Sequence, residues 1–270
     1  MGALMAVLAV APAAGAATTQ SASSGAVRAT FAFTATKGTY ATKTLTISRS
    51  GRVVYREPVS STYCGPNAAA QKYCAPGAFG QGHKAVHVVD LEPGGEPDVV
   101  LDLYTGGAHC CTVEQVFSFD PATGSYVRSE HYFGNPGERI VDLGHDGRLE
   151  FLTADNAFAY AFTDFAASGL PIEILTFAHG SFVNVTHQYP KLIAKDAASF
   201  LKAFNRDHSD GDGLIAAWAA DEDSLGHRAL VANVLARELK AGDLHGLNYR
   251  SGEKFLAALG KFLRKYGYLH

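Results

Sequence analysis

The spacing of apolar residues changes once along this chain, at Pro190. Before Pro190, short alternating or β-branched runs are separated by turns rich in Gly, Pro and Asn, which is typical of β-strands. The predicted strands are 29–35, 43–48, 53–55, 85–91, 98–104, 112–119, 125–133, 139–143, 150–153, 172–177 and 182–187. After Pro190 the apolar spacing is helical, and the predicted helices are 197–204, 214–225, 229–239 and 253–266.

These patterns predict an α+β fold with two parts. Residues 27–190 form a mainly antiparallel β body, either a sandwich or a partial propeller-like arrangement. Residues 191–270 form a helical segment that packs on this body through an apolar stripe of Phe255, Leu259, Phe262 and Tyr266.

The first residues are typical of an export signal. Residues 1–16 are apolar and end in Ala14-Gly15-Ala16, an A-x-A cleavage pattern, so we expect a signal peptide that is removed after Ala16. The first Lys or Arg is Arg28, so the basic residues that usually begin a signal peptide are missing. The alternative to a signal peptide is an Ala-rich N-terminal tail. Residues 17–26 are Ser, Thr, Gln, Gly and Ala, which predicts a flexible linker. We expect a secreted or cell-envelope protein with no membrane span in its mature form.

The four cysteines fit an exported protein, because an oxidising compartment allows them to pair. Cys64 and Cys74 flank a short polar loop, which favours a local disulfide. Cys110 and Cys111 are adjacent, with Cα atoms only about 3.8 Å apart across a trans peptide, and a bond between them is strained. Two local pairs are favoured, and crossed pairs stay open.

Composition and motifs exclude several function classes. The 270 residues are 47% hydrophobic and 18% charged, as in ordinary globular proteins, and the net charge of -3 comes without a basic run, so nucleic acid is not an expected partner. The nucleophile-elbow, dinucleotide, P-loop and H-E-x-x-H zinc patterns are all absent from the sequence. No catalytic class follows from motifs alone.

An internal repeat brings acidic residues into equivalent positions. Val88-Val89-Asp90-Leu91 recurs as Ile140-Val141-Asp142-Leu143, at an offset of 52 residues. Each copy predicts a strand, a Gly-containing acidic loop and a second strand. The loop carboxylates are Asp90, Glu92 and Asp98 in the first copy and Asp142, Asp146 and Glu150 in the second.

These loops resemble the calcium loops of FG-GAP repeats, the integrin alpha-like or VCBS type, which have the pattern D-x-D-x-D-G-x-x-D. The resemblance implies that the six carboxylates are calcium ligands. Gly94 and Gly144 each replace one ligand of that pattern, so binding is expected to be weaker than in a complete loop. The alternative is that Asp and Gly simply form turns between strands.

The densest reactive cluster is His109-Cys110-Cys111 after Gly106-Gly107. We favour a vicinal disulfide that rigidifies the loop, and soft-metal binding and thiol exchange are the alternatives. The YTGGAHCC stretch, with GNPG at 134–137 and residues 155–172, resembles a group of uncharacterised exported bacterial proteins. That resemblance implies export and no particular reaction.

The leading functional hypothesis is a secreted, non-enzymatic binding or cell-envelope module, stabilised by calcium, with an unknown extracellular ligand or envelope component as its partner. The alternative is an extracellular hydrolase that acts on a cell-wall or polysaccharide substrate. Its carboxylates would come from Asp102, Asp155 and Asp164, which lie near aromatic residues in the sequence.

Overall fold

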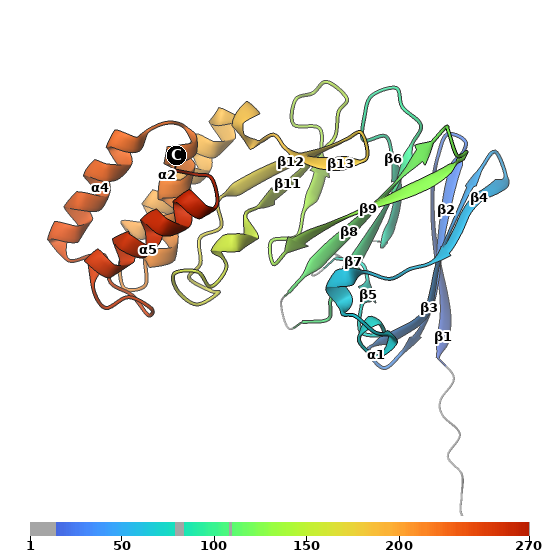
Figure 1. The fold of residues 1–270 in the computed structure, drawn as a ribbon, viewed down its shortest axis with the longest axis horizontal. Helices are drawn as coiled ribbons and strands as arrows, with labels where there is room; N and C mark the ends of the chain where they lie inside the picture. The colour runs from blue at the N-terminus through green and yellow to red at the C-terminus, as the bar shows by residue number, and fades with distance from the viewer. Residues whose placement is uncertain (1–14, 79–83, 108–109, 270) are drawn as a thin grey trace, which may run out of the picture.

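The structure is a computed structural model that describes residues 15–78, 84–107 and 110–269. It has three antiparallel sheets followed by a helical end, so the α+β prediction with a β-rich body is confirmed. Figure 1 shows the layers in sequence from one end of the molecule to the other: the helices, the third sheet, the central sheet and the first sheet.

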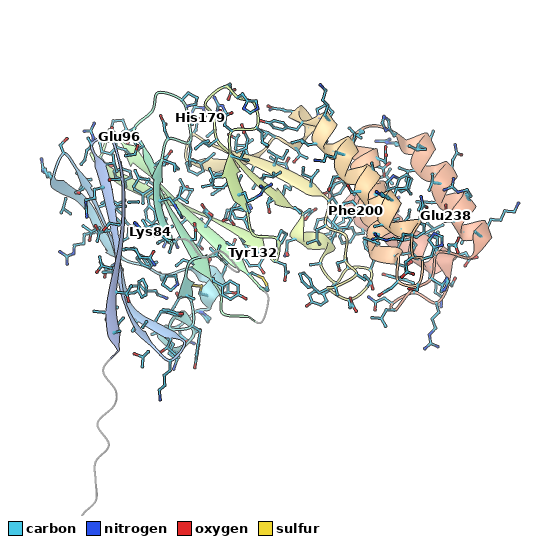
Figure 2. All side chains as sticks on the ribbon, turned by 180° about the vertical axis from the view of Figure 1, so that it is seen from behind. Lys84, Glu96, Tyr132, His179, Phe200 and Glu238 are labelled. Atoms are coloured by element: carbon cyan, nitrogen blue, oxygen red, sulfur yellow. A yellow bond between two sulfur atoms is a disulfide. The ribbon has the colours of Figure 1, made fainter. Side chains whose placement is uncertain are left out.

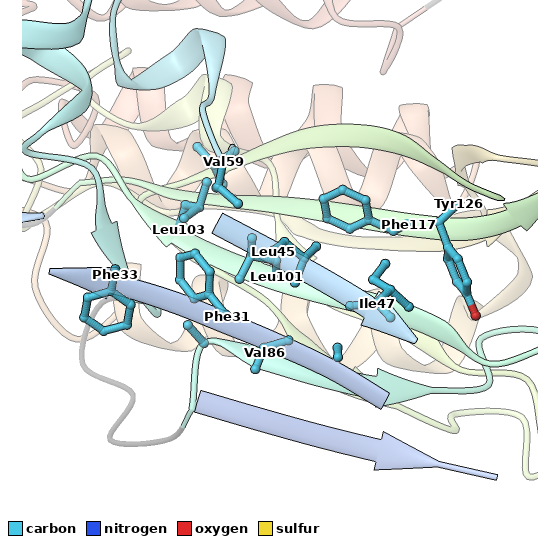
Figure 3. Packing of buried hydrophobic residues seen from close by; sticks show 14 of the residues in the cluster. Phe31, Phe33, Leu45, Ile47, Val59, Val86, Leu101, Leu103, Phe117 and Tyr126 are labelled. Atoms are coloured by element: carbon cyan, nitrogen blue, oxygen red, sulfur yellow. The ribbon is translucent and has the colours of Figure 1, made fainter. Parts of the chain in front are cut away.

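The first sheet is a four-stranded meander in the order β1-β2-β3-β4. Its strands are β1 (Ala16–Ser24), β2 (Val27–Thr36), β3 (Thr39–Arg49) and β4 (Arg52–Pro58). Alternate residues of β2 are buried, as the period of two in the sequence predicts. They pack against the central sheet, and Figure 3 shows this contact around Phe31, Leu45, Leu101 and Phe117.

The prediction that residues 17–26 form a flexible linker is wrong. They belong to strand β1, which pairs with β2 from Ala16↔Ala35 to Ser24↔Val27. An edge strand needs backbone hydrogen bonds more than apolar side chains, so a Ser- and Thr-rich segment can form one. Two contacts tie β1 to the segment before β6: Lys84 Nζ donates to the Ser21 carbonyl (3.0 Å), and the Ala85 amide donates to Gln20 Oε1 (2.7 Å). Figure 2 shows Lys84 between these two sheets.

The central sheet is buried on both faces. It contains β5 (Ala75–Pro76), β6 (Val86–Val89), β7 (Asp98–Tyr104), β8 (Thr112–Asp120) and β9 (Ser125–Gly134), in the order β5-β7-β8-β9 with β6 also paired to β7. On β7, Val99 and Leu101 contact the first sheet, whereas Val100 contacts the third. Six consecutive residues, Asp98–Leu103, are consequently buried.

The third sheet covers the other face of the central sheet. It has the order β10-β11-β12-β13, with β10 (Arg139–Val141), β11 (Glu150–Ala154), β12 (Ile172–Ala178) and β13 (Ser181–Asn184). Phe133 of the central sheet stacks on Phe151 of β11 with ring centroids 5.7 Å apart, and Phe177 joins the same cluster. The β body is therefore a three-layer stack.

The helices form a core of their own at one end of the molecule. They are α2 (Pro190–Phe204), α3 (Asp212–Ser224), α4 (Arg228–Ala241) and α5 (Gly252–Lys265), and the shorter elements are η1 (Thr62–Cys64), α1 (Ala68–Gln71), η2 (Asn156–Phe158) and η3 (Thr186–Gln188). Phe262 of α5 contacts Phe158 and Phe162, which follow β11, at 4.8 and 5.0 Å between ring centroids. The β body thus reaches the helical core through this segment. None of the helices in the described ranges has the length and apolar character needed to cross a membrane.

Cys64 and Cys74 form a disulfide that closes the loop around α1, and both are buried in the first core. In the chain-entropy account, a bridge over a loop of this length stabilises the folded protein by about 3 kcal/mol. We expect the double variant Cys64→Ala/Cys74→Ala to lose about that much free energy of unfolding in urea. The double variant Cys110→Ala/Cys111→Ala closes no loop and serves as the control. An equal loss in both variants would contradict this account of the first bridge.

Candidate functional site

Three buried carboxylates converge between the central and third sheets. Asp102 of β7 and Glu114 of β8 are direct cross-strand partners, and Glu138 precedes β10. Their relative exposures are 3%, 0% and 7%. One carboxylate oxygen from each lies within 4.8 Å of the others. We name Asp102, Glu114 and Glu138 the carboxylate cluster.

Strand alternation explains why these side chains meet. Leu101 and Leu103 face the first sheet, so Asp102 between them faces the third. Glu114 has the same relation to Val113 on β8. Glu138 follows Gly137, whose φ of 63° favours glycine and whose added Cβ would lie 3.4 Å from Thr112 Oγ1. That close approach brings Glu138 against β8.

His87 joins the cluster from the neighbouring strand β6. Its Nε2 atom lies 3.4 Å from Asp102 Oδ2, and its side chain is 32% exposed, so it is the cluster's connection to solvent. The hydrogen bond with Asp102 raises the pKa of His87, and partial burial opposes this shift.

Glu114 is the anomaly of the site. It is fully buried, and no donor among the described residues hydrogen-bonds to either of its carboxylate oxygens. Burial, followed by the charges of Glu138 and Asp102, raises the pKa of Glu114 well above its ordinary range. Burial and the charge of Asp102 also raise the pKa of Glu138, to about 7. Both pKa values are raised, so a negative charge on this pair is costly unless a cation balances it.

The donor set of this site suits a divalent metal ion. Carboxylate oxygens are ligands for Ca²⁺, Mg²⁺ and Mn²⁺, and an imidazole nitrogen such as His87 Nε2 extends the choice to Zn²⁺. A bound dication would balance the buried charge of Glu114, whose two oxygens have no hydrogen-bond partner among the described residues. The arrangement can thus bind a metal ion.

The GGAHCC loop closes the same hairpin. Tyr104 and Thr112 are cross-strand partners two residue pairs beyond Asp102 and Glu114, and the chain between them carries the two adjacent cysteines. Cys110 and Cys111 are bonded to each other, and all four cysteines of the chain are paired in the local connectivity that the sequence favoured. The pairing in the structure is thus the vicinal disulfide that the sequence analysis favoured at this loop. His109 lies outside the described residues.

Tyr132 of β9 supports this loop. Its hydroxyl donates to Cys111 Sγ at 2.7 Å, and its ring stacks on Tyr63 at 4.9 Å between centroids. The Thr105 amide donates to the Cys111 carbonyl (3.0 Å), and the Cys111 amide donates to Thr105 Oγ1 (2.9 Å). These contacts fix Cys111 against Thr105 and Tyr132, close in the chain to Glu114.

The two repeats form equivalent hairpins. Val89↔Asp98 and Val141↔Glu150 are the pairs that close the two loops, which both span eight residues, 90–97 and 142–149. The loops lie side by side, since the Leu149 amide donates to the Leu91 carbonyl at 3.3 Å. The sequence analysis predicted a strand-loop-strand repeat, and the two hairpins have this arrangement.

Five of the six predicted calcium ligands have a polar contact inside the protein. Asp142 accepts from the amides of Asp146 (3.2 Å) and Gly147 (3.1 Å), and Glu150 accepts from the Leu143 amide (2.9 Å). Asp146 accepts from the Arg148 amide, Glu92 lies 3.7 Å from the Arg148 guanidinium, and Asp98 accepts from the Ser118 hydroxyl of β8. The sixth, Asp90, has a buried Oδ1 without a hydrogen-bond partner among the described residues. The described part of the chain has two groups of three metal-type ligand residues whose ligand atoms lie within 4.8 Å of one another. Neither group includes any of the six predicted calcium ligands. The turn interpretation accounts for these contacts.

The structure gives the predicted hydrolase carboxylates different partners. Asp102 lies in the carboxylate cluster, Asp164 accepts from the Ala167 amide, and Asp155 accepts from the Tyr268 hydroxyl at 2.9 Å. Asp155 lines a cavity of about 260 Å³ together with Glu173. Burial and the charge of Asp155 raise the pKa of Glu173 to about 7. The carboxylate pair of this cavity is therefore Asp155 and Glu173, a residue that the sequence analysis did not select.

Glu114 and Glu138 were also missed. The available signal was Glu114-Gln115 inside the otherwise apolar run 112–117, because two polar residues in a strand that is buried on both faces need a reason. Gln115 has one: its amide donates to the Ser60 carbonyl (2.8 Å) and to Glu130 (2.5 Å). Glu114 does not.

No family model matches this chain. A probable thylakoid lumen protein of Synechocystis sp. is 30% identical over 136 residues, which is 48% of this chain and 40% of that protein. An uncharacterized protein of Sinorhizobium fredii is 27% identical over 132 residues, 48% of this chain and 19% of that protein. The chain thus spans less than half the length of these relatives. A solved Xanthomonas protein related to type IV secretion covers 64% of this chain and 98% of its own, with 13% identity and a TM-score of 0.27.

The cluster predicts how stability depends on pH. The raised pKa values of Glu114 and Glu138 mean that the folded state binds more protons than the unfolded state, so the stability of metal-free protein falls as pH rises from about 4.5 through about 7. Glu114→Gln removes one of the two competing charges. Both proteins should lose stability between pH 5 and pH 8. We expect the unchanged protein to lose about 2 kcal/mol more of its free energy of unfolding than Glu114→Gln loses.

Urea unfolding at both pH values, in the presence of a chelator, measures this difference. Other buried acids are common to both proteins, so their contributions cancel. Parallel pH dependences would show that the Glu114–Glu138 pair does not titrate as described.

Proposed function

We propose that this protein is an exported, non-enzymatic binding module that holds a divalent cation in the carboxylate cluster. The observation that carries the proposal is Glu114, a fully buried carboxylate without a hydrogen-bond donor in the described chain, which faces Asp102 and Glu138. An unpaired buried carboxylate costs several kcal/mol, and a coordinated cation is a common way to remove that cost. The cation would join β7, β8 and the start of β10, and so lock the central sheet to the third.

Export is supported by two observations. Both disulfides belong to the folded structure, and such bonds persist in oxidising compartments. A relative that shares 30% identity over about half of this chain is named as a probable thylakoid lumen protein. Together with the A-x-A pattern at Ala14–Ala16, these favour a secreted or cell-envelope location. The ligand or envelope partner of the module is unknown.

Calcium is the first cation to test, because three carboxylates supply up to six oxygens. We expect calcium to raise the melting temperature of chelator-treated protein, through ligand stabilisation of the folded state. Glu114→Gln keeps the shape of the side chain and removes its charge, so this variant should lose at least half of the rise. Manganese and zinc, tested in parallel, report whether His87 contributes as a ligand.

Asp142→Asn/Asp146→Asn is the matched control, because it changes the predicted calcium loop and leaves the cluster intact. If this double variant abolishes the calcium response and Glu114→Gln keeps it, the FG-GAP-like loop is the binding site and the cluster proposal is wrong. If no divalent cation changes the melting temperature, both locations are wrong.

A second candidate function has one observation in its favour, the cavity that holds Asp155 and Glu173. A carboxyl group with a pKa near 7 close to a second carboxyl group is a pairing that glycoside hydrolases use. If the protein is a hydrolase of cell-wall or polysaccharide substrate, it should release reducing ends from such material, and Glu173→Gln should lower the rate by about 100-fold. Asp164→Asn, which alters only a turn, should keep the rate. Absence of release by the unchanged protein removes this candidate.

A further inference from the structure

The helical end contains a second buried carboxylate that lacks a partner. Asp212 is the first residue of α3 and has a relative exposure of 0%. Neither of its carboxylate oxygens has a hydrogen-bond partner among the described residues. Burial and the charge of Asp210 raise the pKa of Asp212 to about 6. The residue belongs to the DHSDGDG segment, whose spacing fits no EF-hand register.

Gly246 lets two carboxylates approach the same point of the backbone. A Cβ added to Gly246 would lie 2.8 Å from Asp212 Oδ2 and 3.2 Å from Asp210 Oδ1, and these are among its three nearest atoms. Gly246 is not among the residues with positive φ, so its backbone conformation does not demand glycine. A side chain at 246 would instead displace the two carboxylates, which converge on this position from the start of α3 and the residue two before it.

The local structure does not neutralise these two acids. Asp210 Oδ1 accepts from Thr163 Oγ1 at 2.6 Å, which is a neutral donor. The N-terminus of α3 contributes about half an elementary charge, against two carboxylates. Asp210 and Gly246 are both partly exposed, so an ion can reach the position from solvent.

A neighbouring group of metal-type ligands is compensated differently. His208, Glu238 and Asp243 have ligand atoms within 4.8 Å of one another, at the helical end where Figure 2 labels Glu238. His208 Nδ1 lies 3.4 Å from Asp243, and Arg237 donates to Glu238 through Nε (2.8 Å) and Nη2 (2.5 Å). Because those charges already have partners, they do not need a metal ion.

We propose that a divalent cation of the calcium type binds between Asp210 and Asp212 above Gly246, and ties the α2–α3 linker to the α4–α5 linker. Asp212 supplies buried carboxylate oxygens and Asp210 supplies at least one more, and a side chain at 246 would push the two carboxylates out of this arrangement. Water and backbone carbonyls complete an oxygen shell. This site is separate from the carboxylate cluster, which lies in the β body.

Trp218 provides a readout specific to this position. It is the only tryptophan of the chain and lies in α3 six residues after Asp212, which is about 9 Å along the helix. Terbium, a luminescent calcium analogue, is sensitised by a nearby indole. We expect terbium added to the full-length chain to luminesce when Trp218 is excited, and calcium to compete the signal away.

Asp212→Asn and Gly246→Ala should each lower this luminescence at least tenfold. Gly260→Ala is the matched control, because Gly260 also lacks a positive φ and its added Cβ meets only the end of Arg264, at 3.6 Å. Glu114→Gln should keep the signal, which separates this site from the carboxylate cluster. Circular dichroism verifies that each variant is folded. The proposal is overturned if the unchanged protein gives no sensitised signal, or if folded Gly246→Ala keeps the full signal.

Discussion

The structure depends on a central sheet that is apolar on both faces. Leu101 and Phe117 pack on the first sheet, and Val100 and Val116 pack on the third, so β7 and β8 have no solvent side along most of their length. Apolar burial on two faces of one strand pair accounts for most of the stabilisation that holds the three layers together. It also means that any polar residue on these strands must find a partner inside the protein.

The polar residues of β7 and β8 meet this requirement in different ways. Asp98 accepts a hydrogen bond from Ser118 at 2.6 Å, and Asp102 lies beside His87. Gln115 is held by the Ser60 carbonyl and Glu130. Glu114 differs from these residues, because neither of its carboxylate oxygens has such a donor in the described chain while it faces the carboxyl groups of Asp102 and Glu138. The proposed function follows from this exception, since a metal ion would satisfy all three carboxyl groups at once.

The order of strands and helices was predictable because the apolar spacing is local information. The predicted strand 98–104 matches β7 residue for residue, and the predicted helix 253–266 differs from α5 by one residue at each end. The repeat was predictable too, down to the matching closure at Asp98 and Glu150. Strand β1 was missed because an edge strand can form from Ser and Thr residues without an apolar pattern.

The site was less predictable, since it depends on which strands become neighbours. The sequence pointed to Asp102 and to the GGAHCC loop, and both lie on the hairpin of the carboxylate cluster. Glu138 comes from the approach to another sheet, so spacing along the chain says nothing of its distance from Glu114. The acidic loops attracted attention through composition, yet their carboxylates bond to nearby backbone amides, as turn residues do.

The most direct test of the account is a crystal structure of the protein grown with manganese, with anomalous diffraction data that locate the metal. The account predicts an anomalous peak between Asp102, Glu114 and Glu138, with metal–oxygen distances near 2.2 Å. A map with strong peaks elsewhere and none at this position would contradict it, and would mean that Glu114 is kept in the core as a neutral acid.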